Sequence, residues 1–228
     1  MTGRPYHHGD LGSALLDAAE ALVRERGVEG WSLREVSARV GVSPSAAYHH
    51  FASRDALVRT LAGRVLAGLA EHLRHAAARA RGRCTDPGQR LVAVGRGYVR
   101  WTLADPAVAG LAFGAHHDEP DAPHPHDVLT DELDRLVAAG GLAAAARPGA
   151  EFTLWAAVHG LATLLRDGLL RLDGPRAVDR EAERLVRAVL TGLAATPPAP
   201  GARSAHTERR TRPDLGSEPV RTSPSGRV

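Results

Sequence analysis

Hydrophobic residues recur along the chain every three or four positions, which is the spacing of amphipathic α-helices. Residues 31–51 carry this spacing twice. Ser32 and Glu35 match a capping box, in which a hydroxyl and a carboxylate satisfy free backbone donors at the start of a helix. Gly41 then tolerates the positive φ of a helix end, and Ser43 is a good N-cap for a second helix. The stretch predicts a helix-turn-helix, whose second helix is built to enter the major groove of DNA.

The same spacing predicts further helices on both sides of this motif, and no alternating strand pattern competes with them. The first has Asp10 as its expected N-cap and stops at Gly27. The segment 148–172 is the most apolar, and a helix that is apolar around much of its circumference is buried on several sides. We therefore predict an all-α fold. The expected helices beyond the motif lie at about residues 10–26, 53–79, 86–101, 105–113, 127–139, 148–172 and 175–195.

Three segments lack the helical spacing. Residues 1–9 contain Arg4 and no acid, and they predict a flexible arm that either reaches into a minor groove or is simply disordered. Residues 114–125 are polar and rich in proline, which is typical of a loop. Residues 196–228 interleave proline with serine, glycine and arginine. Such a composition cannot bury enough apolar surface to offset the entropy of ordering, so we expect a disordered tail.

Composition places the chain among globular proteins that act inside the cell. Its 228 residues are 43% hydrophobic, which is ample for a core. The chain has no apolar run long enough to span a membrane and no signal peptide, so we expect a cytoplasmic protein with no membrane partner. Cys84 is the single cysteine, which excludes an internal disulfide. The net charge of +3 fits a nucleic-acid partner only weakly, because the tail contributes to it.

The order of these elements resembles the N-terminal DNA-binding domain of TetR-family transcriptional regulators. The likeness rests on a first helix, then SLREVSARVGVSPSAAYHHF at residues 32–51, then SRDAL opening a long helix. Farther on, WAAVHGLATLL at residues 155–165 resembles the C-terminal domain class marked by Trp-x-x-x-His-Gly. The resemblance implies five parts, which are a flexible arm (1–9), a helix-turn-helix domain (10–52), a connecting helix (53–80), a ligand-binding and dimerisation domain (81–195) and a disordered tail (196–228).

The resemblance implies a transcriptional regulator, most simply a repressor that a small molecule releases from its operator. The implied partners are double-stranded operator DNA, a second copy of the chain and a largely apolar effector. The helices 148–172 and 177–195 of both subunits would form the four-helix interface of the homodimer. The residues agree, since these helices carry more apolar surface than one subunit needs, although the core of a monomer is the alternative. A ligand that shifts the 53–79 helix would move the reading helices apart.

The residues predicted to contact DNA lie in and beside the second helix of the motif. Arg34 is the candidate for a bidentate contact to guanine, and a solvated surface arginine is its alternative. The resemblance places Tyr48, His50 and Arg54 at positions where the family contacts phosphates. The small residues at the start of the reading helix permit close approach but specify few bases. The predicted set is Arg34, Ser43, Pro44, Ser45, Tyr48, His49, His50 and Arg54.

The DNA-binding part has no net positive charge. Residues 1–60 hold seven arginines (4, 24, 26, 34, 39, 54 and 59) and seven acids (10, 17, 20, 25, 29, 35 and 55). Binding would then depend on a few well-placed contacts rather than on a basic field. We therefore expect modest affinity for DNA and a shallow dependence on salt.

The remaining aromatic residues predict an apolar effector cavity in the C-terminal part, although packing in the core explains each of them equally well. The candidates are Trp101, Phe113, Phe152, Trp155 and His159. His159 is either a polar group of the cavity or a satisfied core imidazole. Gly160 beside it would let a neighbouring helix approach closely.

Six side chains of the 114–126 segment are of types that ligate metals, namely His116, His117, Asp118, Glu119, His124 and His126. A proline-rich loop fixes no ligand geometry, so we predict no metal site and no cofactor. An all-α enzyme that uses these histidines or His159 is a competing hypothesis, but no nucleophile and base pair, phosphate loop or paired carboxylates support it. A nonspecific nucleic-acid binder that uses the arginines of the tail is another.

Overall fold

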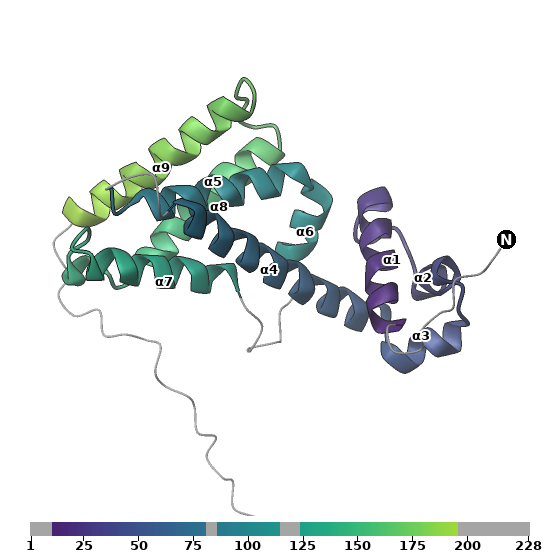
Figure 1. Cartoon of the computed structure of the whole chain (residues 1–228). Helices are drawn as coiled ribbons and strands as arrows, with labels where there is room; N and C mark the ends of the chain where they lie inside the picture. The colour runs from purple at the N-terminus through teal and green to yellow at the C-terminus, as the bar shows by residue number, and fades with distance from the viewer. Residues whose placement is uncertain (1–10, 81–85, 115–123, 196–228) are drawn as a thin grey trace, which may run out of the picture. The chain divides into compact units, whose positions relative to one another are not determined.

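The computed structural model describes residues 11–80, 86–114 and 124–195, and every regular element in these ranges is a helix. The all-α prediction is confirmed for this part of the chain. The predicted arm, the tail and the N-cap Asp10 lie outside the described residues. The elements are α1 (Leu11–Arg26), α2 (Leu33–Val40), α3 (Pro44–His50), α4 (Arg54–Arg79), α5 (Gln89–Ala104), α6 (Pro106–Gly114), α7 (Pro125–Ala138), the short 3-10 helix η2 (Ala144–Ala146), α8 (Ala150–Arg166) and α9 (Pro175–Ala195) (Figure 1).

The helix-turn-helix forms as predicted, because each local signal adopts its expected geometry. The Ser32 side chain accepts a hydrogen bond from the backbone of Glu35, and the Glu35 carboxylate accepts one from the backbone of Ser32 at 2.9 Å. Gly41 takes a φ of 79° at the end of α2. Ser43 caps α3 by accepting from the Ala46 N–H at 3.2 Å. These contacts fix where α3, the predicted reading helix, begins.

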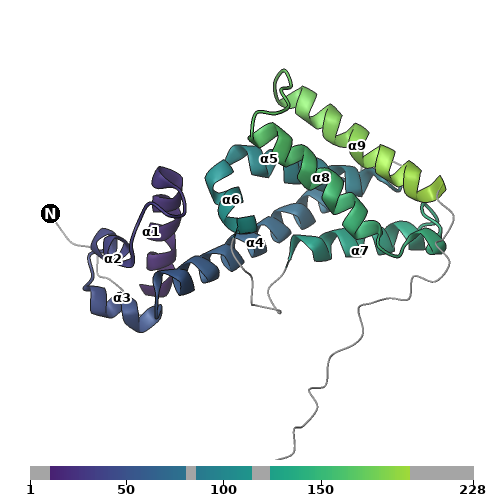
Figure 2. The same cartoon turned by 180° about the vertical axis from the view of Figure 1, so that it is seen from behind.

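Two clusters of buried side chains hold the helices together. The first joins α1, α2, α3 and the first half of α4, and it also includes Val108, Leu111 and Ala112 of α6. The second joins the rest of α4 to α5, α7, α8 and α9. In Figure 2, α8 and α9 lie side by side over α5, which contacts both of them as well as α4 and α7. Among the described residues, no helix is both long and apolar enough to cross a membrane.

Three helices begin or end at other residues than the sequence-based expectation. The predicted helix 148–172 is shorter, since α8 begins at Ala150, after Gly149 with a φ of 74°, and ends at Arg166. α7 begins at Pro125, two residues before the expected start, because the His124 side chain caps it. α5 begins at Gln89, since the Asp86 side chain accepts from the Gly88 N–H and forms a turn before the helix.

The end of α8 has a clear local cause. Gly168 adopts a φ of 72°, and the Leu170 N–H donates back to the Leu164 carbonyl at 3.0 Å. This is the closing pattern of a helix C-terminus, and it turns the chain before the apolar spacing runs out. Leu169 is consequently 76% exposed instead of lying in a helix.

Helix α9 packs tightly against α5 at Gly95. A Cβ atom at this position would lie 2.6 Å from Cγ2 of Val186, which is fully buried. Gly95→Ala should therefore overpack the bundle and lower the free energy of unfolding by about 1–3 kcal/mol. Urea denaturation monitored by circular dichroism measures this loss.

The matched control for this prediction is a compensating substitution. Val186→Ala should destabilise the protein alone, through the cavity it leaves, but cost less in the presence of Gly95→Ala. Strictly additive losses in the double variant would show that the two side chains do not compete for the same space.

Candidate functional site

The predicted reading helix presents one face to solvent. Ala47 is fully buried and orients α3 against the core of the N-terminal helices. Tyr48 is 50% exposed, and His50 is exposed beside the start of α1, with its Nδ1 3.6 Å from the position of a Cβ on Gly12. The small residues at the N-terminal end of the helix are also open to solvent. The exposed members of the predicted set are Arg34, Ser43, Pro44, Ser45, Tyr48, His49 and His50.

Arg34 differs from most arginines around it because it makes no ion pair. Arg24 pairs with Glu20 at 2.5 Å and with Asp105 at 2.6 Å. Arg26 and Arg39 pair with the exposed acids Glu35 and Glu25, at 2.7 Å and 2.5 Å. Within the described part of residues 1–60, the arginines without an ion pair are Arg34 and Arg59. Although arginines and acids are equal in number, Arg34 on α2 therefore keeps an unpaired guanidinium.

Arg54 has an internal role that its sequence position did not indicate. Its Nε donates to the Trp31 carbonyl at 3.1 Å, and its Nη2 donates to the Val28 carbonyl. The guanidinium carbon lies 4.8 Å from the centre of the Trp31 ring, within the range of a cation–π interaction. Arg54 thus ties the start of α4 to the loop before α2. These contacts occupy the group that was expected to reach a phosphate.

The C-terminal helices bring four rings of the sequence together. Tyr98 on α5 lies edge-on to Trp155 on α8, with ring centroids 5.2 Å apart, and Phe113 on α6 lies 5.8 Å from Trp155. The Tyr98 hydroxyl and His159 Nδ1 are 2.7 Å apart, a hydrogen-bond distance. His159 is stacked on Trp155 with an interplanar angle of 12°. His159 is therefore a hydrogen-bonded imidazole inside an aromatic cluster.

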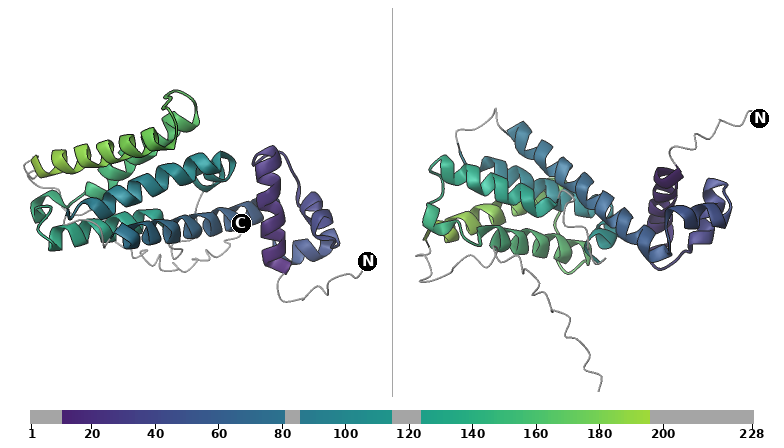
Figure 3. Two further views of the ribbon diagram at one scale, coloured as in Figure 1. Left: turned by 45° about the horizontal axis from the view of Figure 1, so that its top comes forward. Right: turned by 90° about the horizontal axis from the view of Figure 1, so that it is seen from below.

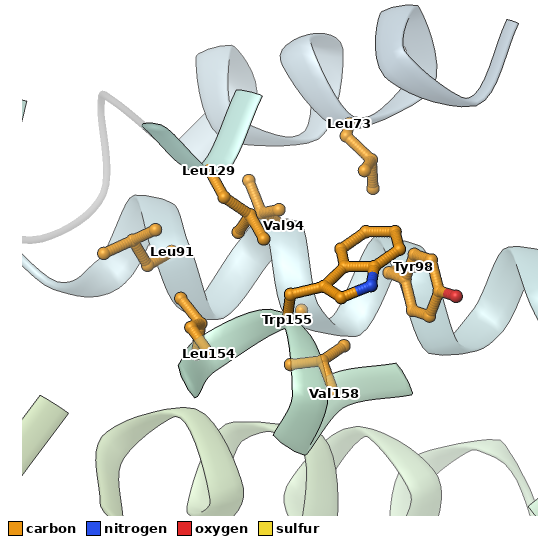
Figure 4. A pocket seen from close by; sticks show the side chains of 9 residues that line it. Leu73, Leu91, Val94, Tyr98, Leu129, Leu154, Trp155 and Val158 are labelled. Atoms are coloured by element: carbon orange, nitrogen blue, oxygen red, sulfur yellow. The ribbon is translucent and has the colours of Figure 1, made fainter. Parts of the chain in front are cut away.

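A small apolar cavity adjoins this cluster. Figure 4 shows the Trp155 indole pointing between Leu73 and Tyr98, with Leu129 and Val94 on its other side. The cavity holds about 10 Å³, which is the space of a single water molecule. An effector of drug-like size needs several hundred Å³. Trp155 therefore fills the place where the sequence predicted a ligand cavity, and a ligand could enter only if side chains moved.

The five predicted cavity residues do not all meet at this point. Trp155 lines the cavity, and Phe113 and His159 contact its ring. Phe152 is 56% exposed and lies against His126, with ring centroids 5.1 Å apart, so it does not line this cavity. Trp101 is also absent from the lining, and it packs instead against both hydrophobic clusters. Tyr98, another aromatic residue of the C-terminal part, lines the cavity, but its pairing with His159 could not be predicted because only the fold brings these positions together.

The histidine-rich segment is described only in part. His116, His117, Asp118 and Glu119 lie outside the described residues. His124 is the N-cap of α7, and His126 lies in its first turn. No group of three or more side chains suited to a metal occurs within the ranges 11–80, 86–114 and 124–195. The hypothesis of a metal site in the loop therefore gains no support from these residues.

Burial controls the protonation of the aromatic cluster. Desolvation lowers the pKa of His159, and the positive charge of Arg166 lowers it further. Burial also raises the pKa of the Tyr98 hydroxyl well above its usual value. Both groups are consequently neutral at pH 7, and the imidazole tautomer sets which of them donates in their hydrogen bond.

The lowered pKa of His159 predicts a loss of stability in acid. Below the unfolded-state pKa of about 6.5, the unfolded chain binds a proton at this position more readily than the folded chain does. The contribution of neutral His159 to the free energy of unfolding is therefore complete above that pH. It declines as the pH falls toward the folded-state pKa of His159. His159→Gln should lose less free energy of unfolding between pH 7.5 and pH 5.5 than the wild type, as measured by urea denaturation. Equal losses would contradict a buried neutral imidazole.

Comparisons with known proteins agree with this arrangement. Residues 15–61 match the family model described as bacterial regulatory proteins of the tetR family. Residues 91–189 match the model of a tetracyclin repressor-like C-terminal domain. The narrower Trp-x-x-x-His-Gly class stays a prediction. Among curated proteins, none matches the chain.

Solved structures with the same fold align with most of the chain. A protein of unknown function from Rhodococcus sp. RHA1 is 29% identical with a TM-score of 0.70, and the match covers 84% of this chain and all of that one. MexZ, a repressor responsible for antibiotic resistance in Pseudomonas aeruginosa, is 19% identical with a TM-score of 0.54 over 83% of this chain and 98% of its own. RolR in complex with the ligand resorcinol is 17% identical with a TM-score of 0.55 over 82% and 94%. The two matched family models and the shared fold show that the chain belongs to the TetR family of bacterial transcriptional regulators.

Proposed function

We propose that this protein is a ligand-responsive repressor that binds its operator as a homodimer and leaves it when a small molecule binds. The observations that carry the proposal are the exposed N-terminal residues of α3 and the exposed, unpaired guanidinium of Arg34 on the preceding helix α2. Small residues at this face let the helix approach base edges, and a free guanidinium can bind guanine in a bidentate manner. MexZ, which has the same fold, is a repressor. We therefore favour repression over activation.

The outer faces of α8 and α9 support a dimer. Phe152 and Leu164 are 56% and 44% exposed, and they lie with Ala156 and Gly160 on one stripe of α8. Gly160 was expected to admit a neighbouring helix, yet no atom of the described chain lies within 4 Å of its Cβ position. The second half of α9 adds exposed small residues. An apolar stripe of this kind suits the same stripe of a second copy.

Leu164→Asp tests the dimer directly, because it places a charge in the proposed interface. We expect this variant to run as a monomer in size-exclusion chromatography with light scattering, at concentrations where the wild type is a dimer. Leu169→Asp is the matched control, since Leu169 is also an exposed leucine but lies beyond the end of α8. The interface assignment fails if Leu164→Asp and Leu169→Asp have the mass of the wild type.

Helix α6 offers a route from the effector to the DNA-binding helices. Its residues belong to the hydrophobic cluster of α1–α4, while Phe113 near its end contacts Tyr98 and Trp155. Asp105 at its start pairs with Arg24 of α1 at 2.6 Å. A molecule that displaced the Trp155 ring would press on Phe113 and hence on α6 and α1. Ligand binding would then favour a second position of the reading helix, which is switching by differential affinity.

The side chains that line the cavity favour an uncharged effector. No charged side chain lines it, and Tyr98 is the lining residue with a hydroxyl. The effector is therefore an uncharged, largely apolar molecule that makes a hydrogen bond with Tyr98 or His159. RolR, a protein of the same fold, binds the small phenol resorcinol.

The experiment that tests the proposal begins with DNA. The purified protein is mixed with fragments of its own genome, and the retained fragments are sequenced. Sequence-selective retention is expected, and small molecules are then screened for release of the retained fragment. Retention without sequence preference would contradict the proposal.

A further inference from the structure

A groove runs along the seam between α4 and α5, away from the aromatic cavity. It encloses about 430 Å³, and its lining residues come from these two helices alone. Figure 3 shows α4 and α5 next to one another in two further views. The residues of α8 and α9 in the proposed dimer face do not line it. The function proposed above assigns it no role.

Small side chains make this hollow. Ala76 on α4 meets Gly97 on α5, where an added Cβ would lie 3.4 Å from the Cβ of Ala76. Ala93 and Ala104 continue the floor along α5, and Trp101 adds a large apolar surface. The groove therefore offers a shallow apolar surface bordered by the Trp101 ring, which suits the hydrophobic part of a small organic molecule.

Three arginines border this surface, and Arg79 is the one among them that has no ion pair with the described residues. The lining includes Arg79, Arg96 and Arg100 but no acidic side chain. Burial and the nearby charge of Arg79 lower the pKa of His72, so His72 offers a neutral imidazole at pH 7. Arg79 makes no ion pair or side-chain hydrogen bond with the described residues. A guanidinium of this kind is open to a ligand.

Residues of α9 hold the other two arginines in place. Arg100 donates hydrogen bonds from its Nε and Nη2 atoms to the Asp179 carboxylate of α9. Arg96 donates from Nε to the Asp179 carbonyl at 3.3 Å, and from Nη2 to Glu183. Within the described part of the chain, the Nη1 atoms of both arginines have no hydrogen-bond acceptor. Their pairing with α9 orients the planar forks and reduces the entropy lost when a further anion binds.

We propose that the α4–α5 groove is a second ligand site, which binds a small organic anion with an apolar body, such as an aromatic carboxylate. The carboxylate lies at Arg79 with donors from Arg96 and Arg100, and the ring lies on the small-residue floor toward Trp101. This ligand differs in charge from the uncharged effector of the aromatic cavity. The site does not depend on the repressor function.

Calorimetric titration of the full-length protein with 2-naphthoate tests this site, with the neutral 2-naphthamide as the matched ligand. We expect 2-naphthoate to bind and the amide to bind at least about tenfold more weakly, because a charge-assisted hydrogen bond is lost. Arg79→Ala should weaken naphthoate binding about tenfold. Ala93→Leu should abolish it by filling the floor while every charge is kept. Arg171→Ala, an exposed arginine away from the groove, should bind like the wild type.

Three results would overturn the proposal. The first is an absence of binding heat up to the solubility limit of 2-naphthoate. The second is equal affinity for the anion and the amide. The third is unchanged affinity in both Arg79→Ala and Ala93→Leu, which would place the ligand elsewhere. Thermal unfolding of each variant verifies that it is folded, and operator retention is measured separately, so failure of this site leaves the repressor proposal intact.

Discussion

Arg54→Ala should lower the free energy of unfolding by about 2–4 kcal/mol, because it leaves two backbone carbonyls without their charged donor. The carbonyls belong to Val28 and Trp31, in the loop that leads into α2. The substitution also removes the cation from the Trp31 ring. Thermal and urea unfolding measure the loss, and Trp31 fluorescence reports whether the loop loosens.

Two further variants distinguish a structural role of Arg54 from a contact with phosphate. Arg59→Ala removes an exposed, unpaired arginine from the same helix and should change stability by less than about 0.5 kcal/mol. Arg54→Lys should recover only part of the loss, since an ammonium cannot reproduce the planar fork. If Arg54→Ala is as stable as Arg59→Ala but binds the operator poorly, Arg54 acts on phosphate and its proposed role in holding the loop before α2 is wrong.

Arg34→Ala should weaken operator binding by about 1–3 kcal/mol, or roughly fivefold to 150-fold, through loss of a base contact. Sequence preference at one operator position should relax with it. Tyr48→Phe should weaken binding to all sequences by a smaller factor, because it removes a hydroxyl donor to phosphate. Fluorescence anisotropy with the selected operator and with a scrambled duplex measures both effects.

The control for this prediction lies on the same helix as Arg34. Arg39 is equally basic but pairs with Glu25 at 2.5 Å, so Arg39→Ala should bind the operator nearly as the wild type does. The salt dependence should be shallow, because the helices offer few unpaired cations. The assignment of the reading residues fails if Arg34→Ala and Tyr48→Phe retain full affinity and specificity.

The sequence predicted the elements whose signals are local. Ser32, Glu35, Gly41 and Ser43 act within one turn of the backbone, so the start and end of α2 and the start of α3 could be predicted. The extent of α8 could not, because its apolar spacing continues past the turn at Gly168.

The chemistry of the site depended on tertiary contacts that spacing does not encode. Arg34 and Arg39 look alike in the sequence, and only the fold places an acid beside one of them. Arg54 follows a family pattern, but the backbone carbonyls that it binds lie 23 and 26 residues away along the chain. Tyr98 and His159 are likewise separated by 61 positions.

The central claim is that two copies of α3 read one operator together. Hydroxyl-radical footprinting of the wild-type protein on its selected operator tests this most directly. A symmetric dimer predicts two protected regions about 10 base pairs apart on one side of the duplex, a spacing of roughly 34 Å, and their joint loss in Leu164→Asp. A single protected region, or protection without a fixed position, would contradict the claim.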